Sequence, residues 1–169
     1  MIKPMKPEHT RRERFTAYAA ILRERFQSGL LSELQGLSQW VVWRSELEDG
    51  KNKKVPYNPN HSLAHASVKI PNSWGTLEQS LKALETGNYS GIGFLITPPL
   101  VFIDLDHSYD RTTGAITDPQ AAESVQSLNS YTEASPGNGL HILAYGKLPE
   151  KGIHSAIEMY GQDRFTTIT

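Results

Sequence analysis

The chain has 169 residues, enough for one ordinary domain that buries about 70% of the surface its unfolded form would expose. It has no cysteine, which excludes a disulfide framework and a thiolate zinc site and is typical of a reducing cytoplasm. No apolar run is long enough to span a membrane, and no secretory signal is recognisable. We therefore expect a soluble, cytoplasmic chain without a membrane partner.

The formal net charge of −1 hides an uneven distribution of charge. Residues 1–28 carry a net charge of +4, which leaves −5 for the remainder. A basic segment on an acidic body is typical of a chain that contacts nucleic acid or another acidic partner, but a solvated helix face explains it equally well. Both explanations stay open at the level of sequence.

The first predicted helix covers residues 8–27, where apolar residues recur every three or four positions. Gly29 follows at the position where this helix would end. Residues 39–47, rich in Trp and Val, predict a strand, and residues 48–67 predict a long polar loop with turn signals. The apolar positions of the helix are Phe15, Tyr18, Ala19, Leu22 and Phe26.

A second helix is predicted over residues 72–87, with Asn72 or Ser73 as its cap and Gly87 at its end. Residues 91–96 and 100–106 predict two short strands, because each is a short apolar run and two prolines mark a turn between them.

A third helix is predicted from Asp118, the N-cap, through Pro119 at the first helical position to about Leu128. Further strands are expected over four segments. Strands that mix with helices in this irregular order favour an α+β fold over a doubly wound one. Because the sequence stops within the last of these strands, we expect it to be a fragment of a longer protein. The four segments are residues 130–134, 140–146, 156–161 and 164–169.

The first candidate site is the acidic pair at the end of LVFIDLD. On a strand, alternate residues share a face, so Asp104 and Asp106 would project side by side while Leu105 points into the core. Two neighbouring carboxylates repel each other unless a cation lies between them, and oxygen ligands suit Mg²⁺ or Mn²⁺. The alternative is a pair of solvated aspartates at a strand end.

A third carboxylate, Glu158, lies within the apolar strand pattern AIEMYG. A glutamate in a buried strand needs a partner, and a metal ion shared with the acidic pair would provide one. The alternative is a structural ion pair, for example with Arg164.

The loop SPGNG leads directly to a histidine that opens an apolar run. Small residues such as Ser135, Gly137, Asn138 and Gly139 can present backbone N–H groups to an anion, and the two glycines permit close approach and unusual dihedral angles. His141 would donate a ring N–H to the same phosphate. The alternative is a plain turn followed by a core histidine.

Three motifs in this order, VFIDLD, GLH and IEMY, give the chain its resemblance to a known family. Residues 38–169 resemble the archaeo-eukaryotic primase superfamily, specifically the primase-polymerase domains of phage and plasmid replication proteins. The segments VVWRSELEDGKNKKVPYNP, NSWGTLEQSLKAL, GIGFLI and SYTEASPGNGLHI add to this resemblance.

The resemblance implies an RRM-like palm preceded by a smaller α/β portion. Residues 30–169 would form the catalytic domain, truncated at its C-terminus, whereas residues 1–29, a separate basic N-terminal helix, have no counterpart in this resemblance. The implied activity is template-directed nucleotidyl transfer on single-stranded DNA, with dNTP or NTP as substrate. A helicase domain or protein is a further implied partner.

The resemblance also assigns roles to residues. Two divalent ions, Mg²⁺ or Mn²⁺, would be held by Asp104, Asp106 and Glu158, and His141 with the SPGNG loop would grip the triphosphate. Lys54 and Arg164 are candidates for further phosphate contacts, because charge-assisted bonds suit triphosphate oxygens.

Two other functions remain open. A metal-dependent nuclease would use the same three carboxylates, although it has no need of a loop and a histidine for a triphosphate. A non-catalytic DNA-binding module of a replication initiator would be expected to carry a more basic net charge.

Overall fold

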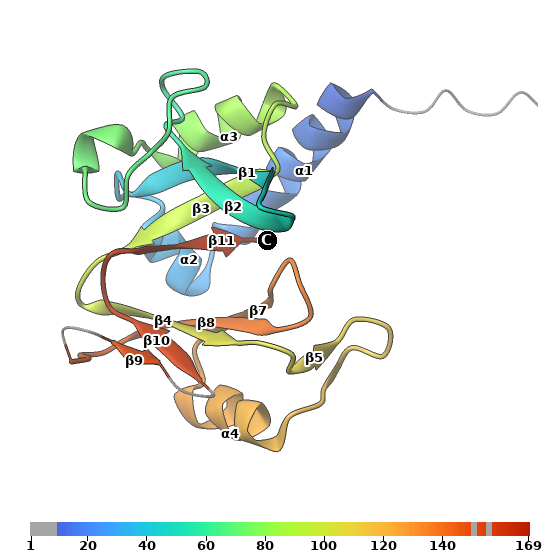
Figure 1. Ribbon diagram of the computed structural model, residues 1–169, viewed down its shortest axis with the longest axis vertical. Helices are drawn as coiled ribbons and strands as arrows, with labels where there is room; N and C mark the ends of the chain where they lie inside the picture. Colours follow the sequence, from blue (N-terminus) through green and yellow to red (C-terminus); the bar gives the residue numbers. More distant parts are fainter. Residues whose placement is uncertain (1–9, 150–151, 155–156) are drawn as a thin grey trace, which may run out of the picture.

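The computed structural model describes residues 10–149, 152–154 and 157–169, and these ranges form two stacked antiparallel sheets with helices on either side (Figure 1). The start of the first predicted helix, both lysines before it, and residue 156 of a predicted strand lie outside the described ranges. The mixture of helices and antiparallel sheets confirms the predicted α+β class.

The first sheet has the strand order β11-β3-β1-β2, with every neighbouring pair antiparallel. Its register sets Trp40 opposite Phe94, and Phe94 opposite Thr166. Its strands are β1 (Trp40–Glu48), β2 (Lys51–Tyr57), β3 (Gly91–Ile96) and β11 (Arg164–Ile168).

The second sheet has the order β7-β8-β4-β10-β9 and is also antiparallel throughout. A separate two-stranded ribbon, β5 with β6, leads from this sheet towards the last helix. The strands of the sheet are β4 (Leu100–Leu105), β7 (Tyr131–Ala134), β8 (Leu140–Tyr145), β9 (Ile153–His154) and β10 (Glu158–Tyr160). Those of the ribbon are β5 (Tyr109–Asp110) and β6 (Ala115–Ile116).

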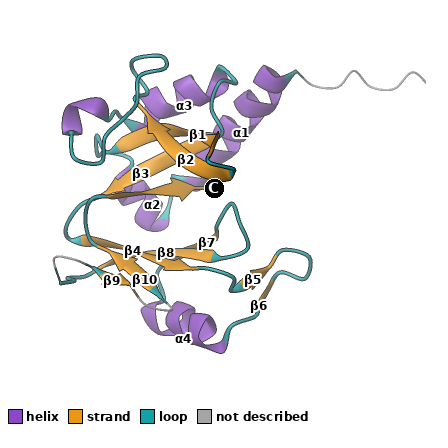
Figure 2. Ribbon diagram, viewed as in Figure 1, coloured by secondary structure: helices purple, strands orange, loops and turns teal. Residues whose placement is uncertain are grey.

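The helices do not all lie on the outer sides of this stack, because α2 lies between the two sheets and contacts β7 (Figure 2). α1, α2 and α3 lie with the first sheet, and α4 lies on the far face of the second. They are α1 (Arg11–Arg25), α2 (Gly29–Leu34), α3 (Leu77–Glu85) and α4 (Pro119–Leu128), with a short 3₁₀ turn over Pro71–Ser73.

The main core lies where one face of the first sheet meets the three N-terminal helices and the second sheet. Trp40 is fully buried there, and its ring makes edge-to-face contacts with Phe26, the C-cap of α1, and Phe94 of β3. Phe102 and Leu143 of the second sheet belong to the same core. This shared core joins the two sheets and so fixes the position of the second sheet, which carries the candidate site.

The predicted loop over residues 48–67 is wrong in its first part, because residues 51–57 form β2 and pair with β1 through a tight turn. Asp49 and Gly50 make that turn with positive φ angles. β2 is an edge strand whose first four residues are exposed, so its sequence lacks the apolar alternation that marks a half-buried strand.

The second predicted helix begins later than expected. Residues 71–73 form the 3₁₀ turn, and the cap of α3 is Thr76 instead of Asn72 or Ser73. Thr76 and Gln79 form a reciprocal capping box, in which each side chain accepts a hydrogen bond from the other residue's backbone N–H. The third helix matches its prediction: the Asp118 side chain accepts from the Gln120 N–H, and the helix ends at Leu128.

Replacement of Thr76 by alanine is expected to lower the free energy of unfolding by about 1 kcal/mol, because an N-terminal N–H of α3 loses its acceptor. Urea denaturation of the whole chain measures this loss. Thr16→Ala is the matched control, since Thr16 is an exposed residue inside α1 and alanine favours helix there. Equal losses in the two variants would contradict the capping role.

Candidate functional site

Four titratable side chains form a row across the second sheet. Glu158 of β10 pairs with Asp104 of β4, Asp104 pairs with His141 of β8, and His141 pairs with Glu133 of β7. Residues directly opposite each other on antiparallel strands project from the same face. The register therefore places all four side chains on one face, the face that Phe102 turns towards the main core.

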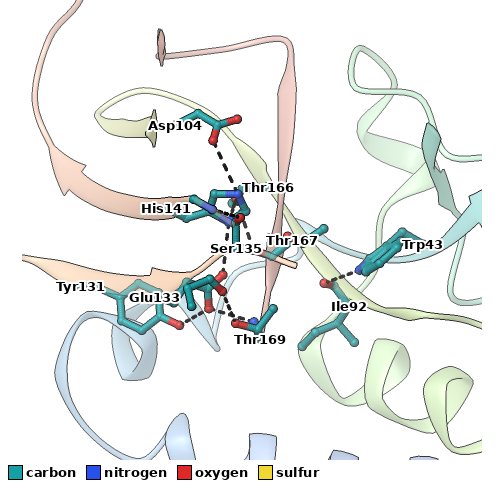
Figure 3. A network of polar contacts seen from close by, with 12 residues as sticks. Trp43, Ile92, Asp104, Tyr131, Glu133, Ser135, His141, Thr166, Thr167 and Thr169 are labelled. Atoms are coloured by element: carbon teal, nitrogen blue, oxygen red, sulfur yellow. Dashed lines mark hydrogen bonds and ion pairs between the residues drawn. The ribbon is translucent and has the colours of Figure 1, made fainter. Parts of the chain in front are cut away.

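His141 lies between two carboxylates, as Figure 3 shows. Its Nε2 atom is 3.8 Å from Oδ1 of Asp104, and its Nδ1 atom is 3.4 Å from Oε1 of Glu133. The hydroxyl of Thr166, from the neighbouring sheet, lies 3.5 Å from Nδ1, and Phe102 packs against the ring edge to face. The ring is buried and oriented by contacts on both nitrogen atoms.

Glu133 was not predicted as a site residue, although it is the most deeply buried carboxylate of the row. Its Oε2 atom accepts hydrogen bonds from the Tyr131 hydroxyl at 2.5 Å and from the Thr169 N–H at 2.8 Å. Burial raises the pKa of Tyr131, and the Glu133 charge raises it further. The signal in the sequence was the one used for Glu158: a glutamate inside a strand pattern, here SYTEA.

Asp104 is held in an unfavourable environment for its charge. Burial raises its pKa and nearby Asp106 raises it further, whereas His141, Arg164 and Lys54 lower it. Its Oδ1 atom is buried and makes no hydrogen bond within the described part of the chain. A carboxylate in this position is ready to accept a cation or a proton.

A cleft of about 500 Å³ brings groups of the two sheets together. Asp104 and His141 line it from the second sheet, and Lys54 of β2 and Arg164 of β11 line it from the first. Burial lowers the pKa of Lys54, and the charges of Asp104 and Asp106 oppose that shift. Lys54 and Arg164, both predicted from sequence as phosphate contacts, thus lie in the same cleft as the first carboxylate of the row.

Tyr160 lies between Glu158 and Arg164. Its hydroxyl donates to Oε2 of Glu158 at 2.5 Å, and the Arg164 guanidinium lies 4.4 Å from its ring centre. Burial and the hydrogen bond with Glu158 raise the pKa of Tyr160 to about 12. Within the described ranges, the direct Glu158–Arg164 ion pair considered from the sequence is not formed.

The acidic residues suit a hard divalent cation in their chemistry. Asp106 follows the last residue of β4 and lies in an exposed turn, while Glu158 lies directly across the ladder from Asp104. Among the described residues no cluster of three or more His, Asp or Glu side chains is already close enough to hold a metal. The buried Asp104 oxygen that accepts no hydrogen bond in the described part of the chain, together with the carboxylate donor set, nevertheless fits Mg²⁺ or Mn²⁺.

The SPGNG loop is the tip of the β7–β8 hairpin and is tied down by its own hydrogen bonds. The Ser135 N–H donates to the Gly139 carbonyl at 2.9 Å, and the Gly139 N–H donates to the Ser135 hydroxyl at 3.2 Å. Arg111 donates to the carbonyls of Ser135 and Gly137, and the Tyr109 N–H donates to the carbonyl of Asn138. Two of the N–H groups expected to face an anion are therefore used within the loop.

The two glycines of the loop differ from the expectation. The expectation of unusual dihedral angles was wrong, because neither Gly137 nor Gly139 has a positive φ. Gly139 does allow a close approach, but of protein backbone: a Cβ atom there would lie 2.5 Å from the Leu105 carbonyl oxygen. The loop residues do not line the cleft in the described structure; they lie against the end of β4 that carries the acidic pair.

The fold and the site together define an α+β protein with a carboxylate and histidine row facing a cleft that also holds basic side chains. No family model matches the chain. In a 149-residue alignment that covers 82% of this chain, the chain is 37% identical to the DNA primase-polymerase of Nitratiruptor phage NrS-1. The chain is thus homologous to part of that protein, of which it spans 20%. This homology confirms the resemblance drawn from the order of the motifs.

No described helix has the length and apolar character needed to cross a membrane.

Proposed function

We propose that this chain is the catalytic part of a DNA primase-polymerase and carries out template-directed nucleotidyl transfer. The observation that carries the proposal is the direct pairing of Asp104 with His141 beside a cleft that also contains Lys54 and Arg164. We further propose that residues 30–169 form the catalytic domain and that the second sheet is its RRM-like palm. Homology to a phage primase-polymerase supports this assignment.

In this proposal the acidic residues and the basic residues have separate tasks. Asp104, Asp106 and Glu158 would hold the divalent ions, which when bound lower the pKa of a 3′-hydroxyl and stabilise the leaving pyrophosphate. The side chains of Lys54 and Arg164 donate hydrogen bonds to the triphosphate, and such charge-assisted bonds are stronger than those between neutral groups.

His141 binds and orients the same nucleotide. Glu133 and Thr166 hold the Nδ1 side of the ring, so that the Nε2 side faces Asp104 and the cleft. Phe102 restricts the tilt of the ring. An imidazole fixed in this way can donate an Nε2 hydrogen to a phosphate oxygen without losing rotational freedom on binding.

A metal-dependent nuclease would use the same carboxylates. The basic side chains on the opposite wall of the cleft favour nucleotidyl transfer, because a triphosphate carries more negative charge than a single phosphodiester and gains more from them.

His141→Ala is expected to weaken Mn²⁺-dependent dATP binding about tenfold, the effect of losing one charge-assisted hydrogen bond. Single-stranded DNA binding should stay unchanged. Calorimetric titration of dATP and ATP, with and without Mn²⁺, measures the first quantity, and fluorescence anisotropy of a labelled oligonucleotide measures the second.

His61→Ala is the matched control, because His61 is exposed and does not line the cleft. Equal weakening of nucleotide and DNA binding in His141→Ala would contradict the phosphate role. The absence of any Mn²⁺-dependent nucleotide binding by the wild-type chain would contradict the proposed function itself.

A further inference from the structure

We propose that one face of α1 binds single-stranded DNA and leads it to the second sheet. This face, the α1 stripe, consists of Arg11, Arg14, Phe15, Tyr18 and Arg25. The identification of the strand as a template rests on the proposed function, whereas the binding surface itself rests on the observations below.

Helix geometry places the five residues of the stripe on one side of α1, where the buried side chain of Leu22 separates Tyr18 from Arg25. At 100° per residue, its five positions fall within about 100° of the helix circumference. Arg11, Arg14, Phe15 and Tyr18 together line a hollow of about 490 Å³. Arg25 and Tyr131 of β7 both line a second hollow of about 570 Å³.

The arginines of the stripe are available for an anion. Arg23, on another face of α1, is used structurally, because it forms ion pairs with Glu78 and Glu85 of α3. In the described part of the chain, by contrast, no carboxylate lies within ion-pair distance of the three stripe arginines. Arg11 instead lies over the ring of Phe15, 5.7 Å from its centre.

The aromatic residues distinguish this surface from a merely basic one. Leu22 and Phe26, the other large apolar residues of the helix that pack inward, are almost fully buried. Phe15 and Tyr18 are only partly buried and pack against the edge of the core, so each also lines the hollow. Aromatic rings interleaved with arginines match a single strand, whose bases stack while its phosphates meet guanidinium groups. A polyanion without bases would use the arginines alone.

The C-terminal end of the stripe lies next to the strand that supports the histidine. Arg25 Nη2 is 3.5 Å from the Tyr131 hydroxyl, and that hydroxyl donates to Glu133, the partner of His141. The Glu133 charge also contributes to the raised pKa of Tyr18, whose main cause is burial. A strand bound along α1 therefore arrives at the edge of the sheet that carries the row of titratable residues.

The test compares two double variants that each remove two positive charges from the same part of the molecule. Arg11→Ala with Arg14→Ala removes them from the stripe. Arg12→Ala with Lys82→Ala removes them from a neighbouring hollow that α1 shares with α3. Anisotropy of a labelled oligothymidylate, titrated over a series of salt concentrations, measures the affinity of the full chain.

We expect the stripe variant to bind about tenfold more weakly, with the salt dependence of log K reduced by about 1.4, corresponding to two lost phosphate contacts. The control variant should change less than twofold. Equal losses in both variants would overturn the proposal, since they would reveal a general electrostatic effect.

Phe15→Leu and Tyr18→Leu test stacking separately, because leucine preserves apolar packing without an aromatic face. Each should weaken oligothymidylate binding about fivefold or more and leave heparin binding unchanged, with circular dichroism as the check on folding. Unchanged DNA binding in both leucine variants would overturn the assignment of single-stranded DNA as the partner. The stripe would then be a binding site for a polyanion that has no bases.

Nucleotide binding keeps this inference separate from the proposed function. The stripe variants should retain Mn²⁺-dependent dATP binding, because the stripe does not line the cleft. If the wild-type chain bound DNA through the stripe but did not bind dATP, the proposed DNA-binding surface would be confirmed and the proposed primase-polymerase function would be contradicted.

Discussion

Replacement of Asp104 and Asp106 by asparagine is expected to abolish Mn²⁺-dependent nucleotide binding and to lower nucleotidyl transfer at least about a hundredfold. Asparagine keeps the shape of the carboxylate but removes the negative charge that a divalent cation needs. The titration of dATP with and without Mn²⁺ measures binding directly, and a primer-extension assay on a single-stranded template measures transfer.

The same change should leave the fold intact. The pKa of Asp104 is raised chiefly by burial, so its ionised form is less favourable in the folded chain than in the unfolded one. For an acid whose pKa is raised in the folded state, the ionised carboxylate destabilises the fold fully at pH values above the folded pKa. This destabilisation disappears as the pH falls below the pKa of the unfolded chain. The double variant should therefore be as stable as the wild type or more stable at pH 7, and the difference should shrink on acidification.

Asp49→Asn with Asp110→Asn is a matched control for charge, because both aspartates are exposed or nearly so and neither lines the cleft. Retained nucleotide binding in the Asp104/Asp106 variant would contradict the metal-binding role. A large fall in its free energy of unfolding would show instead that the acidic pair is structural.

The sequence was sufficient to place two of the three carboxylates in strands, whereas Asp106, expected on the same strand as Asp104, lies in the turn that follows it. Asp104 and Glu158 were placed in strands because apolar residues surround them, and both strands are present. Their direct pairing could not be read from the sequence, since it depends on the register of strands that lie more than 50 positions apart along the chain. Glu133 was missed although it carries the signal used for Glu158, and its place beside His141 follows from the register of the β7–β8 hairpin.

Edge positions explain the main errors in the fold. Lys51 and Lys54 belong to an exposed edge strand, where solvent contact removes the alternation that identifies half-buried strands. Yet Lys54 was selected as a phosphate contact from the family resemblance and its charge, and the hairpin that was not predicted is what carries it to the cleft. A strand that the sequence pattern does not predict can thus bring a candidate residue to the site.

Gly139→Ala is expected to destabilise the chain by about 1–3 kcal/mol, the range for a substituent forced into filled space. The new Cβ would lie 2.5 Å from the Leu105 carbonyl oxygen and 3.1 Å from the Asp106 Cα atom, and both are backbone atoms with little room to move. Relief of the contact must push the hairpin tip away from the end of β4, which displaces the turn that carries Asp106.

Gly137→Ala is the matched control two residues away in the same loop. Its Cβ would meet nothing closer than the Ser135 hydroxyl at 3.6 Å, an ordinary contact, so stability should change by less than about 0.5 kcal/mol. Urea denaturation and the Mn²⁺-dependent dATP titration are measured on both variants. Because Gly139 acts through the position of Asp106, its replacement should reduce nucleotide binding even where the chain is still fully folded. Equal stability and equal dATP binding in the two variants would contradict this prediction. The close approach of the loop to β4 would then not position Asp106.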